Sequence, residues 1–149
     1  MLEVTNLENK EGTLADAVVG ADIFIGVSAP GVLTQDMVKT MNKDAIIFAM
    51  ANPVPEIMPD VAKKAGAFIV GTGRSDFDNQ INNSLCFPGL FRGLLQNDIK
   101  KITDEMKIEC AFAIASCVSD EDLSADYVIP NALDGRVSDK ICEILKNFA

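Results

Sequence analysis

The chain has 149 residues, of which 48% are apolar, and its formal net charge is −9. This length and composition suit a single domain over 1–149 with a buried core, and they exclude a disordered chain. The negative charge argues against a nucleic-acid-binding surface. Because the longest apolar run, 45–51, is too short for a bilayer and no signal-peptide pattern opens the chain, we expect a cytoplasmic protein without a membrane partner.

The sequence contains no histidine and four cysteines. Without histidine, the chain by itself cannot perform Ser-His or Cys-His nucleophilic catalysis, and it cannot hold a histidine-ligated zinc. No cysteine belongs to a CxxC pair and no acidic cluster has a metal-binding spacing, so we assign no metal ligand. We expect reduced, buried thiols at Cys86, Cys110, Cys117 and Cys142.

The first half of the chain alternates helical patterns with short apolar runs. Residues 1–12 are polar and aperiodic, and we expect a loop or a cut end there. The apolar runs contain β-branched or aromatic residues and are bounded by Gly, Pro or Asn, which favours strands. The predicted strands are Ala21–Val27, Asp44–Ala51 and Ala67–Gly71, and the predicted helices are Thr13–Val18, Thr34–Met41 and Met58–Lys64.

The apolarity of these strands is continuous rather than alternating. Such strands are typically buried on both faces, as in a parallel sheet that helices cover on each side. The order helix, strand, helix, strand, helix, strand therefore predicts a partial doubly wound α/β fold with a parallel sheet and flanking helices.

Residues 98–149 are predicted to be mainly helical. Apolar residues recur at spacings of three and four from Ile99 to Cys117 and again from Val137 to Phe148, which predicts two amphipathic helices. The polar stretch Ser119–Gly135 is expected to connect them. The sequence thus predicts a helical C-terminal region after the sheet.

An asparagine-rich segment, 79–83, is followed closely by Pro88, Gly89 and Gly93. Proline and glycine are unfavourable inside a plain helix. We therefore expect a kinked or tightly approached helix that presents amides to a ligand. The alternative is a surface cluster of asparagines.

Ligands of open parallel sheets bind beyond the carboxyl ends of the strands. The segments there are Ser28–Gly31, Asn52–Glu56 and Gly71–Asp76, which we expect to gather along one edge. Asn52 is the strongest single candidate, because its amide both donates and accepts hydrogen bonds and could hold a carbonyl or hydroxyl oxygen. The alternative is that Asn52 only begins a turn. A dinucleotide site also needs a GxGxxG turn for its pyrophosphate, and none occurs, so the first βαβ unit of such a site is missing.

Four ordered segments resemble bacterial-type malic enzymes. They are Ile25–Gly31 (IGVSAPG), Ala51–Glu56 (ANPVPE), Gly73–Asn83 (GRSDFDNQINN) and Phe87–Gly93 (FPGLFRG). The likeness implies a Rossmann-like NAD(P)-binding domain of which this chain is the C-terminal portion.

Malic enzymes oxidise L-malate with NAD or NADP and decarboxylate the product to pyruvate, assisted by Mg²⁺ or Mn²⁺. By this resemblance, Asn52 and Asn83 bind the substrate. The implied cofactor-binding residues are Ser28, Ala29, Gly31, Asn52 and Asn82.

The resemblance also implies that groups essential to the family lie elsewhere. Its catalytic tyrosine and lysine, its metal-binding carboxylates and its glycine-rich loop belong to an N-terminal portion, and Tyr127 does not stand in the catalytic motif. We therefore expect the chain to be inactive alone, with that portion as a partner and with a homodimer for the complete enzyme. Asp78 stands where the family has proline, which puts the shape of that turn in question.

Two other hypotheses stay open. One is a non-catalytic α/β binding module that pairs with a separate N-terminal partner. The other is the distal half of another nicotinamide dehydrogenase, such as an amino-acid dehydrogenase, against which the stretch Asn82–Gly93 argues.

Overall fold

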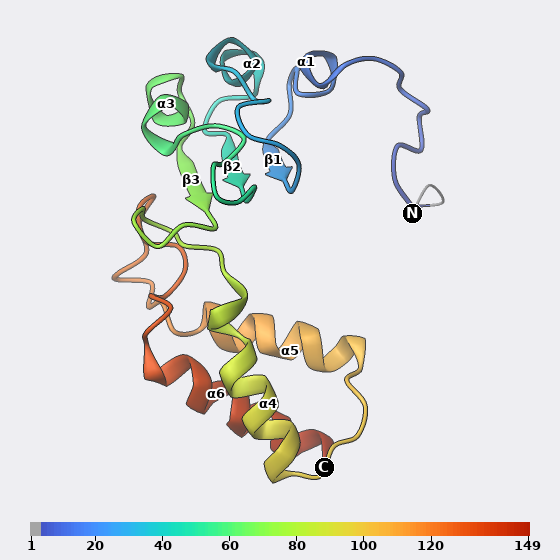
Figure 1. Cartoon of the computed structure of the whole chain (residues 1–149), viewed down its shortest axis with the longest axis vertical. Helices are drawn as coiled ribbons and strands as arrows, with labels where there is room; N and C mark the ends of the chain where they lie inside the picture. The colour runs from blue at the N-terminus through green and yellow to red at the C-terminus, as the bar shows by residue number, and fades with distance from the viewer. Residues whose placement is uncertain (1–3) are drawn as a thin grey trace. The chain divides into compact units, whose positions relative to one another are not determined.

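A computed structural model describes residues 4–149 of the chain (Figure 1). The chain forms two compact units, one that ends at Val70 and one that runs from Gly71 to Ala149. Of the loop predicted at 1–12, residues 4–12 contain no helix or strand, and residues 1–3 lie outside the described part. Within residues 4–149, every helix is too short or too polar to span a bilayer.

The first unit contains a parallel α/β sheet. The strands lie in the order β1-β2-β3, and β1 pairs with β2 in parallel. The helices and strands alternate along the chain, which confirms the predicted α/β fold class. The elements are α1 (Leu14–Ala17), β1 (Ile23–Gly26), α2 (Gln35–Thr40), β2 (Ile46–Ala49), α3 (Pro59–Lys64) and β3 (Ile69–Thr72), whose last two residues belong to the second unit.

The first turns of these helices follow from local chemistry. Thr34 caps α2, because its hydroxyl accepts a hydrogen bond from the N–H of Met37 at 3.3 Å. The Asp16 carboxylate accepts the N–H of Thr13 at 2.8 Å and so closes the start of α1. Pro59 is the first residue of α3, where a missing N–H costs nothing.

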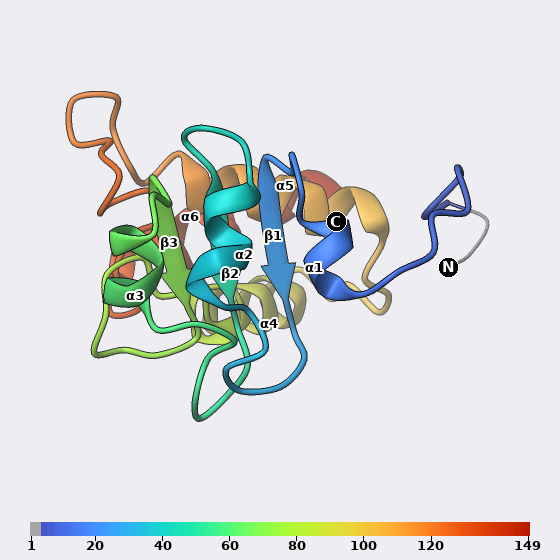
Figure 2. The same ribbon diagram turned by 90° about the horizontal axis from the view of Figure 1, so that it is seen from above.

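The core of the first unit lies between its helices and one face of the sheet. Ile47, Ala49 and Ala62 are fully buried there. Figures 1 and 2 show α1, α2 and α3 together on one face of the strands. The expected burial of the strands on both faces is wrong for β1. Its Phe24 is buried, but Ile23 and Ile25 are 53% and 65% exposed, because these helices cover one face only.

The second unit is mainly helical, as predicted. Its elements are η1 (Asn83–Leu85), α4 (Phe87–Gln96), α5 (Asp104–Ala115), α6 (Gly135–Leu145) and η2 (Lys146–Phe148). The apolar residues that bury this unit's core include Leu90, Leu94, Met106, Cys110, Ile141 and Leu145.

Two helix boundaries differ from the predicted ones. The helix expected from Ile99 begins instead at Asp104, because the Thr103 hydroxyl accepts the N–H of Met106 at 3.2 Å and caps the helix there. Ile99 still packs against the core, but from the preceding loop. The helix expected from Val137 begins two residues earlier, where Asp134 accepts the N–H of Arg136 at 3.0 Å.

The glycines of α4 allow a close approach between helices. A Cβ at Gly89 would lie 2.9 Å from the Cα of Ser138, and a Cβ at Gly93 would lie 2.6 Å from Cδ1 of Leu145. Both neighbours belong to α6, which packs against α4 and α5. A tightly approached helix is therefore confirmed, but α6 and not a ligand makes the approach at these two glycines.

Candidate functional site

The loops after β1 and β2 run side by side in the first unit. The N–H of Gly31 donates to the carbonyl of Pro55 at 3.1 Å, and the N–H of Leu33 donates to the carbonyl of Glu56 at 3.1 Å. Gly31 has a φ of +68°, a left-handed conformation that favours glycine and lets this loop turn back. The sheet thus brings together two of the three segments that the sequence predicted at its carboxyl edge.

Glu56 joins these two loops through its side chain. One carboxylate oxygen, Oε1, accepts the N–H of Ser28 at 2.7 Å and the hydroxyl of Ser28 at 3.1 Å. The other, Oε2, accepts the N–H of Ala51 at 3.0 Å. Glu56 is 0% exposed. A single buried carboxylate therefore binds the first residues of both loops.

The surroundings of Glu56 suit a charged carboxylate. Burial raises the pKa of its carboxyl group. The hydrogen bonds from the N–H groups of Ser28, Ala51 and Glu56 itself lower this pKa by more than burial raises it, so that the pKa lies below its ordinary value of 4.5. Gly26 provides the room, since a Cβ there would lie 2.6 Å from the Cδ of Glu56. The carboxylate is thus ionised at neutral pH and fully hydrogen-bonded.

The sequence-predicted residues of these loops lie at the surface, although the hydroxyl and N–H of Ser28 bond to Glu56. Ser28, Ala29, Gly31 and Asn52 are all exposed. Asn52 directly follows the anchored Ala51, and the Asn52–Pro53 peptide bond is cis. The exposed amide of Asn52 and the small-residue loop 28–31 therefore lie in neighbouring loops, and the buried side chain of Glu56 is bonded to both loops.

The other predicted residues, Asn82 and Asn83, lie in the second unit. The Asn82 carboxamide caps η1, because its oxygen accepts the N–H of Ser84 at 3.0 Å while its nitrogen donates to the carbonyl of Gly73 at 3.4 Å. Asn83 is the first residue of η1. Both side chains are exposed. The structure makes them neighbours at the start of η1 and α4.

Asn79 has a structural task that the sequence did not reveal. It is 5% exposed, donates to the carbonyl of Ala125 at 2.8 Å and accepts the N–H of Val128 at 2.8 Å. It thereby ties the asparagine-rich segment to the connection before α6. Nearby, Arg74 forms an ion pair with Asp76 at 2.7 Å and stacks over the ring of Phe77. These contacts fix the shape of the loop that carries Asp78.

Glu56 is the functional candidate that sequence reasoning missed. In the sequence it is the last residue of the loop Asn52–Glu56. One signal could have found it, because a carboxylate between Pro55 and Ile57 in an apolar neighbourhood must be paired or hydrogen-bonded when buried.

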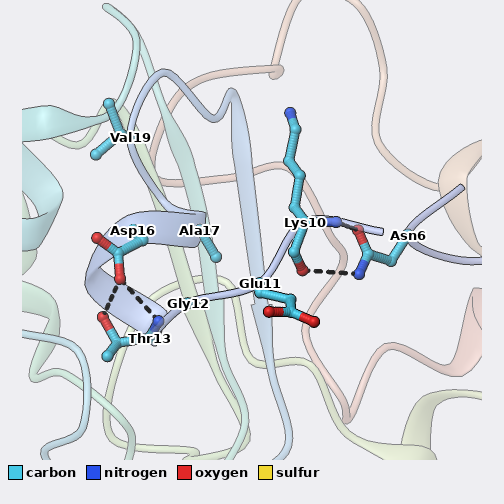
Figure 3. A pocket seen from close by; sticks show the side chains of 8 residues that line it. All are labelled: Asn6, Lys10, Glu11, Gly12, Thr13, Asp16, Ala17 and Val19. Carbon is cyan, nitrogen blue, oxygen red and sulfur yellow. Dashed lines mark hydrogen bonds between the residues drawn. The ribbon is translucent and has the colours of Figure 1, made fainter. Parts of the chain in front are cut away.

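Two hollows of the described surface lie apart from Ser28, Asn52 and Asn83. One of about 550 Å³ is lined by the segment 6–19, where Asp16 bonds to Thr13 and Asn6 bonds to Lys10 (Figure 3). Another of about 290 Å³ lies between 75–80 and 126–131. Neither contains Ser28, Asn52 or Asn83. Within residues 4–149 no group of three or more His, Cys, Asp or Glu side chains could hold a metal ion.

Comparisons with known proteins agree on one family. A family profile described as "Malic enzyme, NAD binding domain" matches residues 2–145. A bifunctional malic/malolactic enzyme of Bacillus subtilis is 57% identical over 97% of the chain and 35% of its own length. An NAD-dependent malic enzyme of Geobacillus stearothermophilus is 49% identical over 93% of the chain and 29% of its length. An NADP-dependent malic enzyme of Escherichia coli is 45% identical over 96% of the chain and 21% of its own length.

Solved structures give the same answer. The malic enzyme of Pyrococcus horikoshii superposes with a TM-score of 0.88 at 48% identity, over 96% of this chain and 33% of that one. The NAD-dependent malic enzyme of Thermotoga maritima superposes with a TM-score of 0.90 at 43% identity, over 97% of this chain and 37% of that one. The chain therefore spans about a third or less of the length of the curated relatives it matches.

Proposed function

The chain belongs to the malic enzyme family, whose NAD-binding domain it matches, and from this premise we propose that it supplies the nicotinamide-facing and substrate-facing side of that domain. In the complete enzyme, L-malate would be oxidised and decarboxylated to pyruvate while NAD or NADP is reduced. The observation that carries the proposal is the pair of loops after β1 and β2, which Glu56 holds side by side at the edge where ligands of parallel sheets bind.

In this proposal the loops after β1 and β2 bind the cofactor, and Asn52 also binds the substrate. Ser28, Ala29 and Gly31 line the cofactor, since their loop has small side chains that let a flat ring approach the backbone. Asn52 stands at the junction between cofactor and substrate. Its exposed carboxamide can donate to one oxygen and accept from a hydroxyl.

Two further residues, the exposed asparagines at the start of η1, are also proposed to bind ligands. We assign Asn83 to the substrate, where its carboxamide would hold a carboxylate or hydroxyl oxygen of malate. Asn82 contacts the nicotinamide side, and its bonds to Ser84 and Gly73 keep its carboxamide in one orientation. An orientation fixed before binding lowers the entropy lost when the ligand binds.

The chemical contribution of these residues is positioning. Hydride transfer needs cofactor and malate in near-attack geometry, and fixed amides provide that geometry without exchanging protons themselves. A bound Mg²⁺ or Mn²⁺ polarises the substrate oxygen in such chemistry. The described residues do not fit a metal site, so the proposal assigns the metal ligands, the proton-transfer groups and the pyrophosphate contacts to the remaining portion of the polypeptide. We expect that portion as the partner, and a homodimer in the cytoplasm for the complete enzyme.

Turnover gives the first test. The purified chain should show no malate-dependent reduction of NAD⁺ or NADP⁺, followed by the absorbance of the reduced nicotinamide, with or without Mn²⁺. Turnover at the rate of a complete malic enzyme would contradict the assignment of the catalytic groups to another portion.

Ligand mapping separates the proposal from the non-catalytic module. Backbone amide spectra of the labelled chain are recorded while NAD⁺, NADP⁺, nicotinamide mononucleotide or AMP is added. We expect the nicotinamide ligands, and not AMP, to shift the amide signals of these two loops, which come from Ser28, Ala29, Gly31, Ala51, Asn52 and Val54. Asn52→Ala should weaken the response, whereas Asn42→Ala, an exposed asparagine that bonds to Asp22 in the same unit, should not. A silent wild-type chain, or shifts confined to 6–19, would favour the module.

A further inference from the structure

The buried carboxylate of Glu56 connects two loops that are separate in sequence. Ser28 and Ala51 each lie two residues beyond the end of a strand, β1 and β2 respectively, and each donates its N–H to a different oxygen of Glu56. Ser28 adds its hydroxyl to Oε1. The side chain is thus hydrogen-bonded to both loops at once.

Apolar packing alone would not place a glutamate here. Taking a carboxylate out of water is costly unless its oxygens are hydrogen-bonded, and an apolar side chain of this size would avoid that cost. An apolar side chain would, however, leave the N–H groups of Ser28 and Ala51 without this acceptor. The bonds to Glu56 and the space that Gly26 leaves for it therefore point to a device that holds the loops.

We propose that Glu56 is a positioning residue: it holds the loops 28–31 and 51–55 in the conformation that binds the nicotinamide half of the cofactor. The inference rests on the proposed function of these loops. Glu56 itself is buried beneath them and touches neither cofactor nor substrate. When the anchor is lost, the loops spend less time in the binding conformation, and the apparent affinity falls by the same fraction.

The two oxygens of Glu56 make a specific prediction for the isosteric variant Glu56→Gln. A carboxamide has one accepting oxygen and one donating nitrogen. Its oxygen satisfies two donors when it faces Ser28 but only one when it faces Ala51, so it takes the place of Oε1. The nitrogen then faces the N–H of Ala51, donor against donor. The loop after β2 is released, while the loop after β1 stays anchored.

The experiment compares the full wild-type chain with Glu56→Gln and with Glu8→Gln, the same change at an exposed carboxylate of the first unit. Amide hydrogen exchange is measured for Ser28 and Ala51, and NAD⁺ affinity is measured from the amide shifts of 28–31. In Glu56→Gln we expect exchange at Ala51 to accelerate at least about tenfold while Ser28 changes less, and the NAD⁺ affinity to fall about tenfold. Glu8→Gln should match the wild type in both.

A second variant keeps the charge and tests the same geometry. Gly26→Ala places a Cβ 2.6 Å from the Cδ of Glu56 and 2.6 Å from the Cε1 of Phe24, so it should displace the carboxylate from both loops together with that ring and accelerate exchange at Ser28 and Ala51. If the exchange of both amides stays at the wild-type rate in both variants, the inference is overturned. It is also overturned if the wild type binds NAD⁺ and Glu56→Gln binds it equally well. A wild-type chain that does not respond to NAD⁺ instead overturns the proposed function, while the exchange pattern still decides whether Glu56 anchors the loops.

Discussion

The packing of α4 on α6 predicts that one added methyl group destabilises the second unit. In Gly89→Ala the new Cβ would lie 2.9 Å from both the Cα and the carbonyl oxygen of Ser138, and 3.0 Å from the Cβ of Ile141. Two of these three atoms belong to the backbone of α6 and cannot rotate away. The helices must move apart, which also stretches the bond from the Cys142 thiol to the carbonyl of Gly89, now 3.3 Å.

The expected magnitude is a balance of two effects. Replacing glycine by alanine inside a helix stabilises it by about 1 kcal/mol. Overpacking a tight interface costs about 1–3 kcal/mol, and backbone neighbours place this site at the upper end of that range. The free energy of unfolding should therefore fall by about 2 kcal/mol, which lowers the melting temperature of a unit of this size by about 10 °C.

The matched control is Gly135→Ala, the same change at the start of α6. Nothing lies within 4 Å of a Cβ at Gly135, so this variant should be neutral or more stable by up to about 1 kcal/mol. Both variants are measured by urea unfolding, followed through amide signals of α6. The reasoning is refuted if Gly89→Ala is as stable as Gly135→Ala, because the close approach would then cost nothing.

Three further predictions concern other buried groups. Asn79→Ala should destabilise the second unit by about 2 kcal/mol, since it removes the hydrogen bonds of Asn79 to Ala125 and Val128. Limited proteolysis should then cut within 119–133 sooner than in the wild type. The pKa of Glu56 is lower in the folded chain than its ordinary value of 4.5, so its contribution to stability is fully present above pH 4.5 and is lost as the pH falls through the lower folded pKa. In urea unfolding, the difference in unfolding free energy between wild type and Glu56→Gln should therefore shrink in acid. A difference that grew in acid would contradict a lowered pKa. Burial is the main cause, and the neighbouring Cys86 the second, of a pKa of Cys110 that is raised to about 11. Iodoacetamide at mildly alkaline pH should therefore modify Cys110 only after unfolding, and rapid modification in the native chain would contradict its burial.

Local patterns predicted the elements of this fold well. The alternation of helices and strands depends on neighbours within a few positions, and the structure confirms it. The helix predicted within 99–117 is present, but its predicted start at Ile99 was wrong. Its apolar spacing reported which residues face the core, and Ile99 does face it, but the cap at Thr103 decides where the helix begins.

The candidate site was predictable in its loops and not in its support. A strand that ends in small residues or in Asn52 indicates a ligand edge, because parallel strands place their carboxyl ends together. The roles of Asn52, Asn82 and Asn83 stay predictions. The partner of Glu56 was not predictable, because Ser28 lies 28 positions away in sequence. No periodicity connects two such residues.

The sequence by itself determined the order of the elements and the family, because each is written in short runs of neighbouring residues, while the edge at which a ligand binds stays a prediction. The tertiary structure decided three things that depend on distant contacts. It buried Glu56 beneath two loops, brought α6 against Gly89 and Gly93, and left Ile23 and Ile25 exposed on one face of β1. Hydrogen bonds and close packing act over a few ångströms in space, and only the folded chain brings residues that far apart in sequence within that range.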